Sequence, residues 1–148
     1  MLYLVRGLPG SGKSTFARSR RFSGCLVLEN DMYHIHNGQY IFNKDDLPDA
    51  IDWCKLSCRQ ALERGMDVVV SNTFTKTKYL QQYVELAKWF GTDYKVYKCT
   101  CNYGNVHNVP DDVLAAMESN WDDWPGEIPI DVTLVGSTTT LDFVERTE

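Results

Sequence analysis

The sequence lacks any long apolar run, and this absence excludes one class of protein. No stretch of about 18 consecutive apolar residues occurs in its 148 residues, so we expect no membrane-spanning helix. The first ten residues, MLYLVRGLPG, contain neither a basic segment nor a long apolar segment, so we expect no secretory signal. The sequence therefore predicts a cytoplasmic protein, in its own cell or in the cytoplasm of an infected host.

The chain lacks the paired cysteines of a disulfide framework or a zinc knuckle. The cysteines are Cys25, Cys54, Cys58, Cys99 and Cys101. An odd number without a secretory signal favours free thiols over a disulfide framework. No pair has the tight spacing of a zinc knuckle, so we interpret the cysteines as small buried apolar residues rather than metal ligands.

An excess of positive charge is also missing. The formal net charge is −5, which argues against a basic protein that coats duplex nucleic acid. The charge is unevenly divided, because residues 1–110 hold 14 of the 15 lysines and arginines but only 10 of the 20 acidic residues. We expect an anionic ligand to bind within residues 1–110. The alternative is that the acidic residues after position 110 simply form a solvated surface.

Short apolar runs alternate with helical patterns along the whole chain. The spacing predicts strands at residues 2–6, 25–29, 67–71, 94–100 and 131–135, and helices at residues 13–20, 47–64, 76–90 and 110–121. Strands separated by helices predict an α/β fold, with a five-stranded parallel sheet and helices on both faces. We expect residues 1–148 to form a single domain, with its ligands at the carboxyl ends of the strands.

One segment carries a specific chemical signal. Residues 7–14, GLPGSGKS, match the phosphate-binding loop G-x-x-x-x-G-K-[ST] and lie between a predicted strand and a predicted helix. Glycines let the backbone approach anionic oxygens, and the amide groups with the helix N-terminus attract negative charge. The residues expected to bind ATP are Gly7, Pro9, Gly10, Ser11, Gly12, Lys13, Ser14 and Thr15. Lys13 would contact the β- and γ-phosphates, and Ser14 would bind Mg²⁺.

Three polar segments follow the other predicted strands. Asp31 follows the second strand, where a carboxylate could accept the proton of a hydroxyl acceptor; the alternative is a helix cap. Asn72 and Thr73 follow the third strand and could hold the acceptor, although turn residues have the same composition. Residues 105–110, NVHNVP, stand where a lid would close over the phosphates, with Asn105 and His107 as its candidate contacts.

Taken together, these segments resemble the bacteriophage polynucleotide kinase family over about residues 2–120. The resemblance combines GLPGSGKST, an N-D-x-Y segment at residues 30–33, S-N-T at residues 71–73 and H-N-V-P at residues 107–110. That family consists of small P-loop kinases of the adenylate-kinase-like class. They transfer the γ-phosphate of ATP to the 5′-hydroxyl end of DNA or RNA. The resemblance implies an α/β P-loop kinase domain that uses ATP and Mg²⁺ and accepts a nucleic acid 5′ end.

The resemblance also assigns roles, and the sequence departs from it at two points. It implies that Lys13 is a catalytic phosphate ligand, that Asp31 is the general base, and that Asn72 and Thr73 line the acceptor site. Where repair members of the family carry an arginine that holds an acceptor phosphate, this chain has His34. The lid segment at residues 101–110 also lacks the arginines that stabilise the transferred phosphate.

The sequence leaves three functions open. The first is an ATP-dependent kinase of a DNA or RNA 5′-hydroxyl, preferring short single strands because the chain is acidic. The second is a kinase of another hydroxyl, on a hydroxymethylated base of phage DNA, a nucleoside or a small metabolite. The third is an NTP-binding interaction module with weak NTPase activity. Tyr33, Tyr40, Phe42 and Phe74 are candidates for stacking on bases, and core packing is the alternative for them.

Overall fold

The computed structural model describes residues 1–100, 109–134 and 141–145, with side chains up to residue 130. Its main sheet contains β1 (Leu2–Arg6), β2 (Leu26–Leu28), β5 (Val68–Asn72), β6 (Tyr94–Cys99), β7 (Ile128–Leu134) and β8 (Leu141–Glu145). The helices are α1 (Lys13–Ala17), α2 (Leu47–Glu63), α3 (Thr77–Trp89) and α4 (Asp111–Ser119). Among these residues no helix is long and apolar enough to cross a membrane.

The strand order is β2-β5-β1-β6-β7-β8, and the first five strands are parallel. This confirms the expected five-stranded parallel sheet. A sixth strand was missed: β8 runs antiparallel to β7, and Ile130 pairs with Glu145. An antiparallel neighbour needs only a short connection, whereas a parallel one needs a long crossover, so the rule used for the other strands could not find it.

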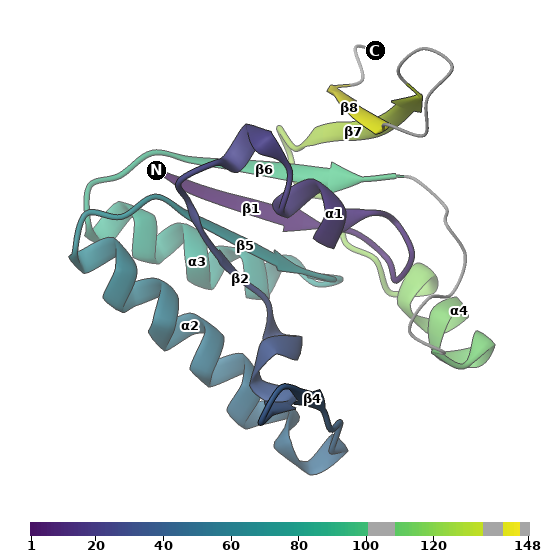
Figure 1. The fold of residues 1–148 in the computed structure, drawn as a ribbon. Coiled ribbons are helices and arrows are strands. Elements are labelled where there is room, and N and C mark those ends of the chain that lie inside the picture. Colours follow the sequence, from purple (N-terminus) through teal and green to yellow (C-terminus); the bar gives the residue numbers. More distant parts are fainter. Residues whose placement is uncertain (101–108, 135–140, 146–148) are drawn as a thin grey trace.

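Helices cover both faces of the sheet, as expected, but unequally (Figure 1). On one face α2 and α3 pack on Leu2, Leu4, Val68, Val70 and Val96. On the other face α1 and the short turn Arg20–Phe22 supply Phe16, Ala17 and Phe22, which pack on Val5, Val69, Tyr97 and Ile130. The alternation of side chains along the strands therefore builds two separate cores.

The same alternation separates the cysteines. Cys54 and Cys58 project from α2 into the core on one face, and Cys99 lies in the core on the other face. These three thiols therefore cannot converge on one metal ion. Burial raises the pKa of Cys54, and it raises the pKa of Cys58 to about 12, so both thiols stay protonated at neutral pH.

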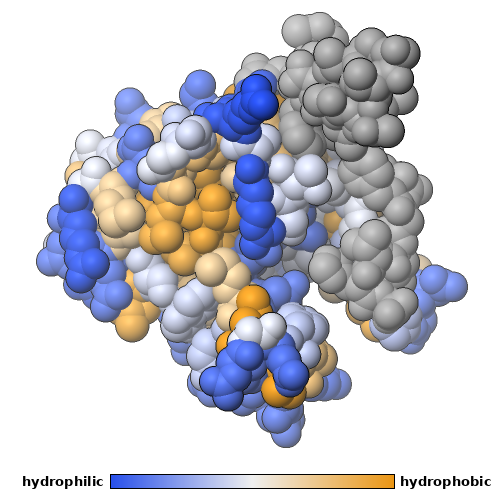
Figure 2. Space-filling view, viewed as in Figure 1, coloured by the Kyte–Doolittle hydropathy of each residue, from blue (hydrophilic) through white to orange (hydrophobic). Residues whose placement is uncertain are grey.

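A small extension that the sequence pattern did not predict lies between β2 and α2. It contains the turn Asn30–His34, the hairpin strands β3 (Ile35–His36) and β4 (Gln39–Tyr40), and the turn Lys44–Asp46. The hairpin exposes apolar side chains, which lie among hydrophilic ones at the bottom of Figure 2. These are Ile35, Tyr40, Ile41 and Phe42.

Candidate active site

The phosphate loop connects β1 to α1 at the carboxyl end of the central strand. Gly10 and Gly12 have φ values of 82° and 87°, which glycine adopts without a steric cost. The Ser11 amide donates to the Leu8 carbonyl at 3.0 Å, and the Phe16 amide donates to the Gly12 carbonyl at 2.9 Å. The loop is therefore a tight turn that leads directly into the first turn of a helix, as an anion-binding loop requires.

Crowding, rather than the backbone torsion angle, requires glycine at position 7. A Cβ atom at this position would lie 2.2 Å from Ser11 Oγ and 3.1 Å from the Cys99 carbonyl oxygen. The Gly7 amide also donates to the Thr73 carbonyl at 3.4 Å. The loop thus folds back on its first residue and contacts the chain after β5.

Lys13, the first residue of α1, is half-buried. Burial is the largest influence and lowers the pKa of Lys13, while the charges of Glu29 and Asp31 act in the opposite direction. A desolvated ammonium gains more from a phosphate oxygen than a solvated one does. The loop geometry and this amine both fit the phosphates of a nucleotide.

Asp31 is exposed in the turn after β2, and two elements meet at it. It is close enough to Lys13 to influence the pKa of that amine. Tyr40, on β4, hydrogen-bonds to Asp31; burial and this carboxylate together raise the pKa of Tyr40. The hairpin therefore contributes a hydroxyl that orients the carboxylate expected to act as the base.

Asn72 ties the end of β5 to the start of that turn. Its Oδ1 accepts a hydrogen bond from the Asn30 amide at 2.8 Å. Its Nδ2 has only a long contact of 3.9 Å with Cys54 Sγ. The Asn72 side chain is therefore a structural link between two strand ends as well as a wall of the neighbouring pocket.

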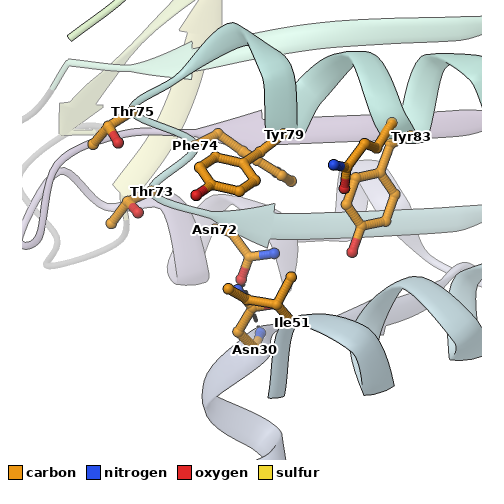
Figure 3. Close-up of a pocket in the computed structure, with 9 residues that line it drawn as sticks. Asn30, Ile51, Asn72, Thr73, Phe74, Thr75, Tyr79 and Tyr83 are labelled. Atoms are coloured by element: carbon orange, nitrogen blue, oxygen red, sulfur yellow. Dashed lines mark hydrogen bonds between the residues drawn. The ribbon is translucent and has the colours of Figure 1, made fainter. Parts of the chain in front are cut away.

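A pocket of about 150 Å³ opens between the end of β5, α3 and α2 (Figure 3). Its lining comprises Asn30, Ile51, Asn72, Thr73, Phe74, Thr75, Tyr79, Gln82 and Tyr83. Asn72 and Thr73, predicted to line an acceptor site, both belong to it. Phe74 has a φ of 48°, a left-handed conformation that is strained for a bulky residue.

Arg6 is a residue that the sequence analysis missed. It is the last residue of β1, and its side chain is 0% exposed. Nη1 lies 2.9 Å from Glu127 Oε2, while Nη2 donates to the carbonyls of Phe74 at 2.6 Å and Asp122 at 2.7 Å. Its guanidinium also lies over the Trp121 ring, with Cζ 4.0 Å from the ring centroid. Burial lowers the pKa of Arg6, and Glu127 opposes that shift.

Asp122 reinforces the connection that Arg6 makes. The Asp122 amide donates to the Thr75 carbonyl at 2.8 Å, and its Oδ2 accepts from the Thr77 amide at 3.2 Å. It thereby caps the first turn of α3. The segment after α4 is thus tied to the wall of the pocket.

The structure brings most of the expected site to one edge of the sheet. The phosphate loop, Asp31 and the pair Asn72 and Thr73 all lie there. His34 is different, because it is only 1% exposed and packs against Tyr40 and Phe42, with ring centroids 6.1 and 5.0 Å away. Asn105 and His107 lie outside the described residues.

Comparison with known proteins places this domain in a family. Residues 2–120 match AAA_33, a family of AAA domains. Over 92 residues, 60% of this chain, the sequence is 35% identical to NEDD4-binding protein 2 of Homo sapiens, and the match spans only 5% of that protein.

Two solved structures share the fold. A gluconokinase from Sinorhizobium meliloti 1021 is 19% identical with a TM-score of 0.60, over 87% of this chain and 81% of its own. A chain of the Pnkp1/Rnl/Hen1 RNA repair complex is 20% identical with a TM-score of 0.55, over 84% of this chain and 40% of its own. At these identities the likeness concerns the fold alone. Because the family match covers most of the chain, the protein belongs to the AAA domain family.

Proposed function

We propose that this domain is an ATP-dependent kinase that transfers the γ-phosphate to the 5′-hydroxyl end of DNA or RNA. One observation carries the proposal: an exposed carboxylate, Asp31, follows Asn30, whose amide is held at 2.8 Å by Asn72 at the end of β5, on the edge of the sheet where the phosphate loop lies. A protein that only binds nucleotides has no need of a base there. The likeness of the fold to a chain of an RNA repair complex and the resemblance to polynucleotide kinases support a nucleic acid acceptor.

In the proposed reaction Asp31 accepts the proton of the acceptor hydroxyl. The acceptor oxygen bonds to the γ-phosphorus as the bond to the leaving ADP oxygen breaks. Lys13 and the loop amides hold the negative charge of the transferred group. The Ser14 hydroxyl would hold Mg²⁺, which supplies further charge neutralisation when bound. Asn72 and Thr73 would contact the acceptor, whereas His34 would reach it only if the hairpin packing changed.

The test is transfer of label from γ-labelled ATP to a short single-stranded oligonucleotide with a 5′-hydroxyl. Asp31→Asn should lower kcat by about 10²- to 10⁴-fold, which is the usual contribution of a general base. Asp52→Asn is the matched control, because Asp52 is an exposed aspartate on α2, outside this site. No labelled end with the wild-type protein, or equal activity of both variants, would contradict the proposal.

A kinase of a small hydroxyl compound is the second candidate. The size of the pocket favours it, because about 150 Å³ is below the usual range for sites that enclose drug-sized ligands. The likeness of the fold to a gluconokinase points the same way. Free nucleosides and gluconate, assayed beside the oligonucleotide, distinguish the two candidates.

A further inference from the structure

The pocket beside Thr73 lies within reach of both halves of the proposed reaction. Its wall at Thr73 contacts the phosphate loop through the 3.4 Å hydrogen bond from the Gly7 amide. Asn30, another lining residue, immediately precedes Asp31 in the chain. A group held in this pocket would therefore lie near Asp31, the proposed general base, and near the phosphate loop.

The chemistry of the lining is uncharged. Figure 3 shows amide, hydroxyl and aromatic side chains around the space. None of the described residues that line it is a lysine, arginine, aspartate or glutamate. Two cations that are not part of the lining contact it: Lys55 Nζ lies 3.4 Å from Gln82 Oε1 in an exposed contact, and Lys78 Nζ lies 5.1 Å from the centroid of the Tyr79 ring. No side chain of the lining offers an opposite charge to a phosphate or carboxylate, so we expect a neutral occupant.

The hydrogen-bonding groups of the lining divide into two sets. Asn72 Oδ1 bonds to the Asn30 amide, and the Tyr83 hydroxyl bonds to Cys54, so these two are already engaged. The side-chain hydroxyls of Thr73, Thr75 and Tyr79 make no hydrogen bond to another described residue. Gln82 uses only its carbonyl oxygen, which leaves its amide donors for a ligand.

Aromatic surface lies beside these free polar groups. The Tyr79 ring and the buried Phe74 ring both line the space, and Phe74 is held edge-on against Tyr83 at 5.5 Å between centroids. Flat aromatic surface next to amide and hydroxyl groups is how proteins bind an unpaired base, by stacking on its face and hydrogen-bonding to its edge.

We infer that this pocket binds the nucleobase of the terminal nucleoside, while the phosphodiesters of the acceptor remain outside it. This inference rests on the proposed kinase function and deepens it. It makes the nucleobase, and not a phosphate of the acceptor, the group that positions the 5′-hydroxyl. An acceptor without a terminal base should then be a poor substrate even though its hydroxyl is intact.

The first test compares an oligonucleotide with its counterpart whose 5′-terminal residue is abasic but keeps the 5′-hydroxyl. Loss of one stacked base should lower kcat/KM about 5- to 150-fold. Tyr79→Ala should cause a similar loss with the normal acceptor and little further loss with the abasic one. Equal rates for both acceptors would overturn the inference while leaving the kinase function intact.

The second test does not need activity. Binding of free nucleosides, and of ribose as the compound without a base, is followed by saturation-transfer NMR. Gln81 and Gln82 are adjacent exposed residues of α3, but only Gln82 lines the pocket, so Gln81→Ala is the matched control for Gln82→Ala. We expect nucleosides but not ribose to bind, and only Gln82→Ala to weaken binding.

The two tests separate the possible failures. If nucleosides bind through Gln82 but no oligonucleotide is phosphorylated, the polynucleotide function is wrong and the base pocket stands. If nucleosides do not bind, or if the two glutamine variants behave alike, the base pocket is wrong whatever the kinase assay shows.

Discussion

Replacing Arg6 should destabilise this domain far more than replacing any surface arginine. Arg6→Met removes the guanidinium but keeps an unbranched side chain of moderate volume. It leaves the Glu127 carboxylate, which is 14% exposed, without its partner, and it leaves the Phe74 and Asp122 carbonyls without their donor. Removing one partner of a buried ion pair typically costs about 3–5 kcal/mol, because the other partner stays buried and unpaired.

The structure supplies a matched control on the surface. Arg18 also pairs with a glutamate, with Nη1 3.2 Å from Glu29 Oε1, but the Arg18 side chain is 54% exposed. Glu29 is 12% exposed, about as buried as Glu127, so the two pairs differ in their arginines. A pair with a solvated arginine is screened by water, and surface pairs contribute roughly 0–1 kcal/mol. Arg18→Met should therefore change the free energy of unfolding by less than about 1 kcal/mol.

Urea unfolding measures both variants. The midpoint for Arg6→Met should fall sharply with an unchanged slope, because the surface exposed on unfolding stays the same. Adding Glu127→Gln to Arg6→Met should restore part of the loss, since the unpaired charge disappears. The reasoning is refuted if Arg6→Met lowers the free energy of unfolding no more than Arg18→Met does. It is also refuted if adding Glu127→Gln to Arg6→Met lowers the free energy of unfolding further by as much as Glu127→Gln does alone.

Four further outcomes are expected. Gly7→Ala should weaken nucleotide binding about 5- to 150-fold, because its Cβ would lie 2.2 Å from Ser11 Oγ and overpacking of this kind costs about 1–3 kcal/mol. Calorimetry should find that adding Ser11→Ala recovers part of the affinity. Lys13→Met should also abolish ATP binding, yet thermal unfolding of the ligand-free variant should occur at the same or a higher temperature than in wild type, because a desolvated charge is gone. The lowered pKa also predicts a pH dependence, because the native state releases the Lys13 proton at a lower pH than the unfolded chain does. Between the lowered pKa and 10.5, the free energy of unfolding of the wild type should therefore rise with pH relative to that of Lys13→Met. Burial raises the pKa of Cys58 to about 12, so at pH 8 this thiol should react with a thiol reagent only as fast as the domain opens. Urea at concentrations below the unfolding midpoint should therefore accelerate its labelling. Rapid labelling of the native protein would contradict its burial.

The features that could be predicted from the sequence are those with a local signal. The five parallel strands have β-branched or alternating runs, and the helices have apolar residues at helical spacing. The phosphate loop has a fixed spacing of glycines and a lysine. Because parallel strands end at a common edge, the positions of Asp31, Asn72 and Thr73 near that loop followed from the alternation of strands and helices along the chain.

The features that could not be predicted depend on partners far away in the chain. Arg6 looks like the exposed end of a strand, and only the fold brings Glu127 and the Asp122 carbonyl to it. His34 looks like an exposed polar residue after a strand, and only the hairpin brings Phe42 over it. No spacing rule along the sequence encodes these contacts.

The position of β1 in the sheet has a consequence for how this protein is made. β1 is central, and its two neighbours are synthesised long after it, because Leu2 pairs with Val68 on one side and with Tyr94 on the other. During translation the apolar strand Leu2–Arg6 therefore leaves the ribosome with both edges unpaired. Such a strand can pair with the wrong partner while it waits, so the first strand of this domain is the segment that a chaperone has most reason to bind.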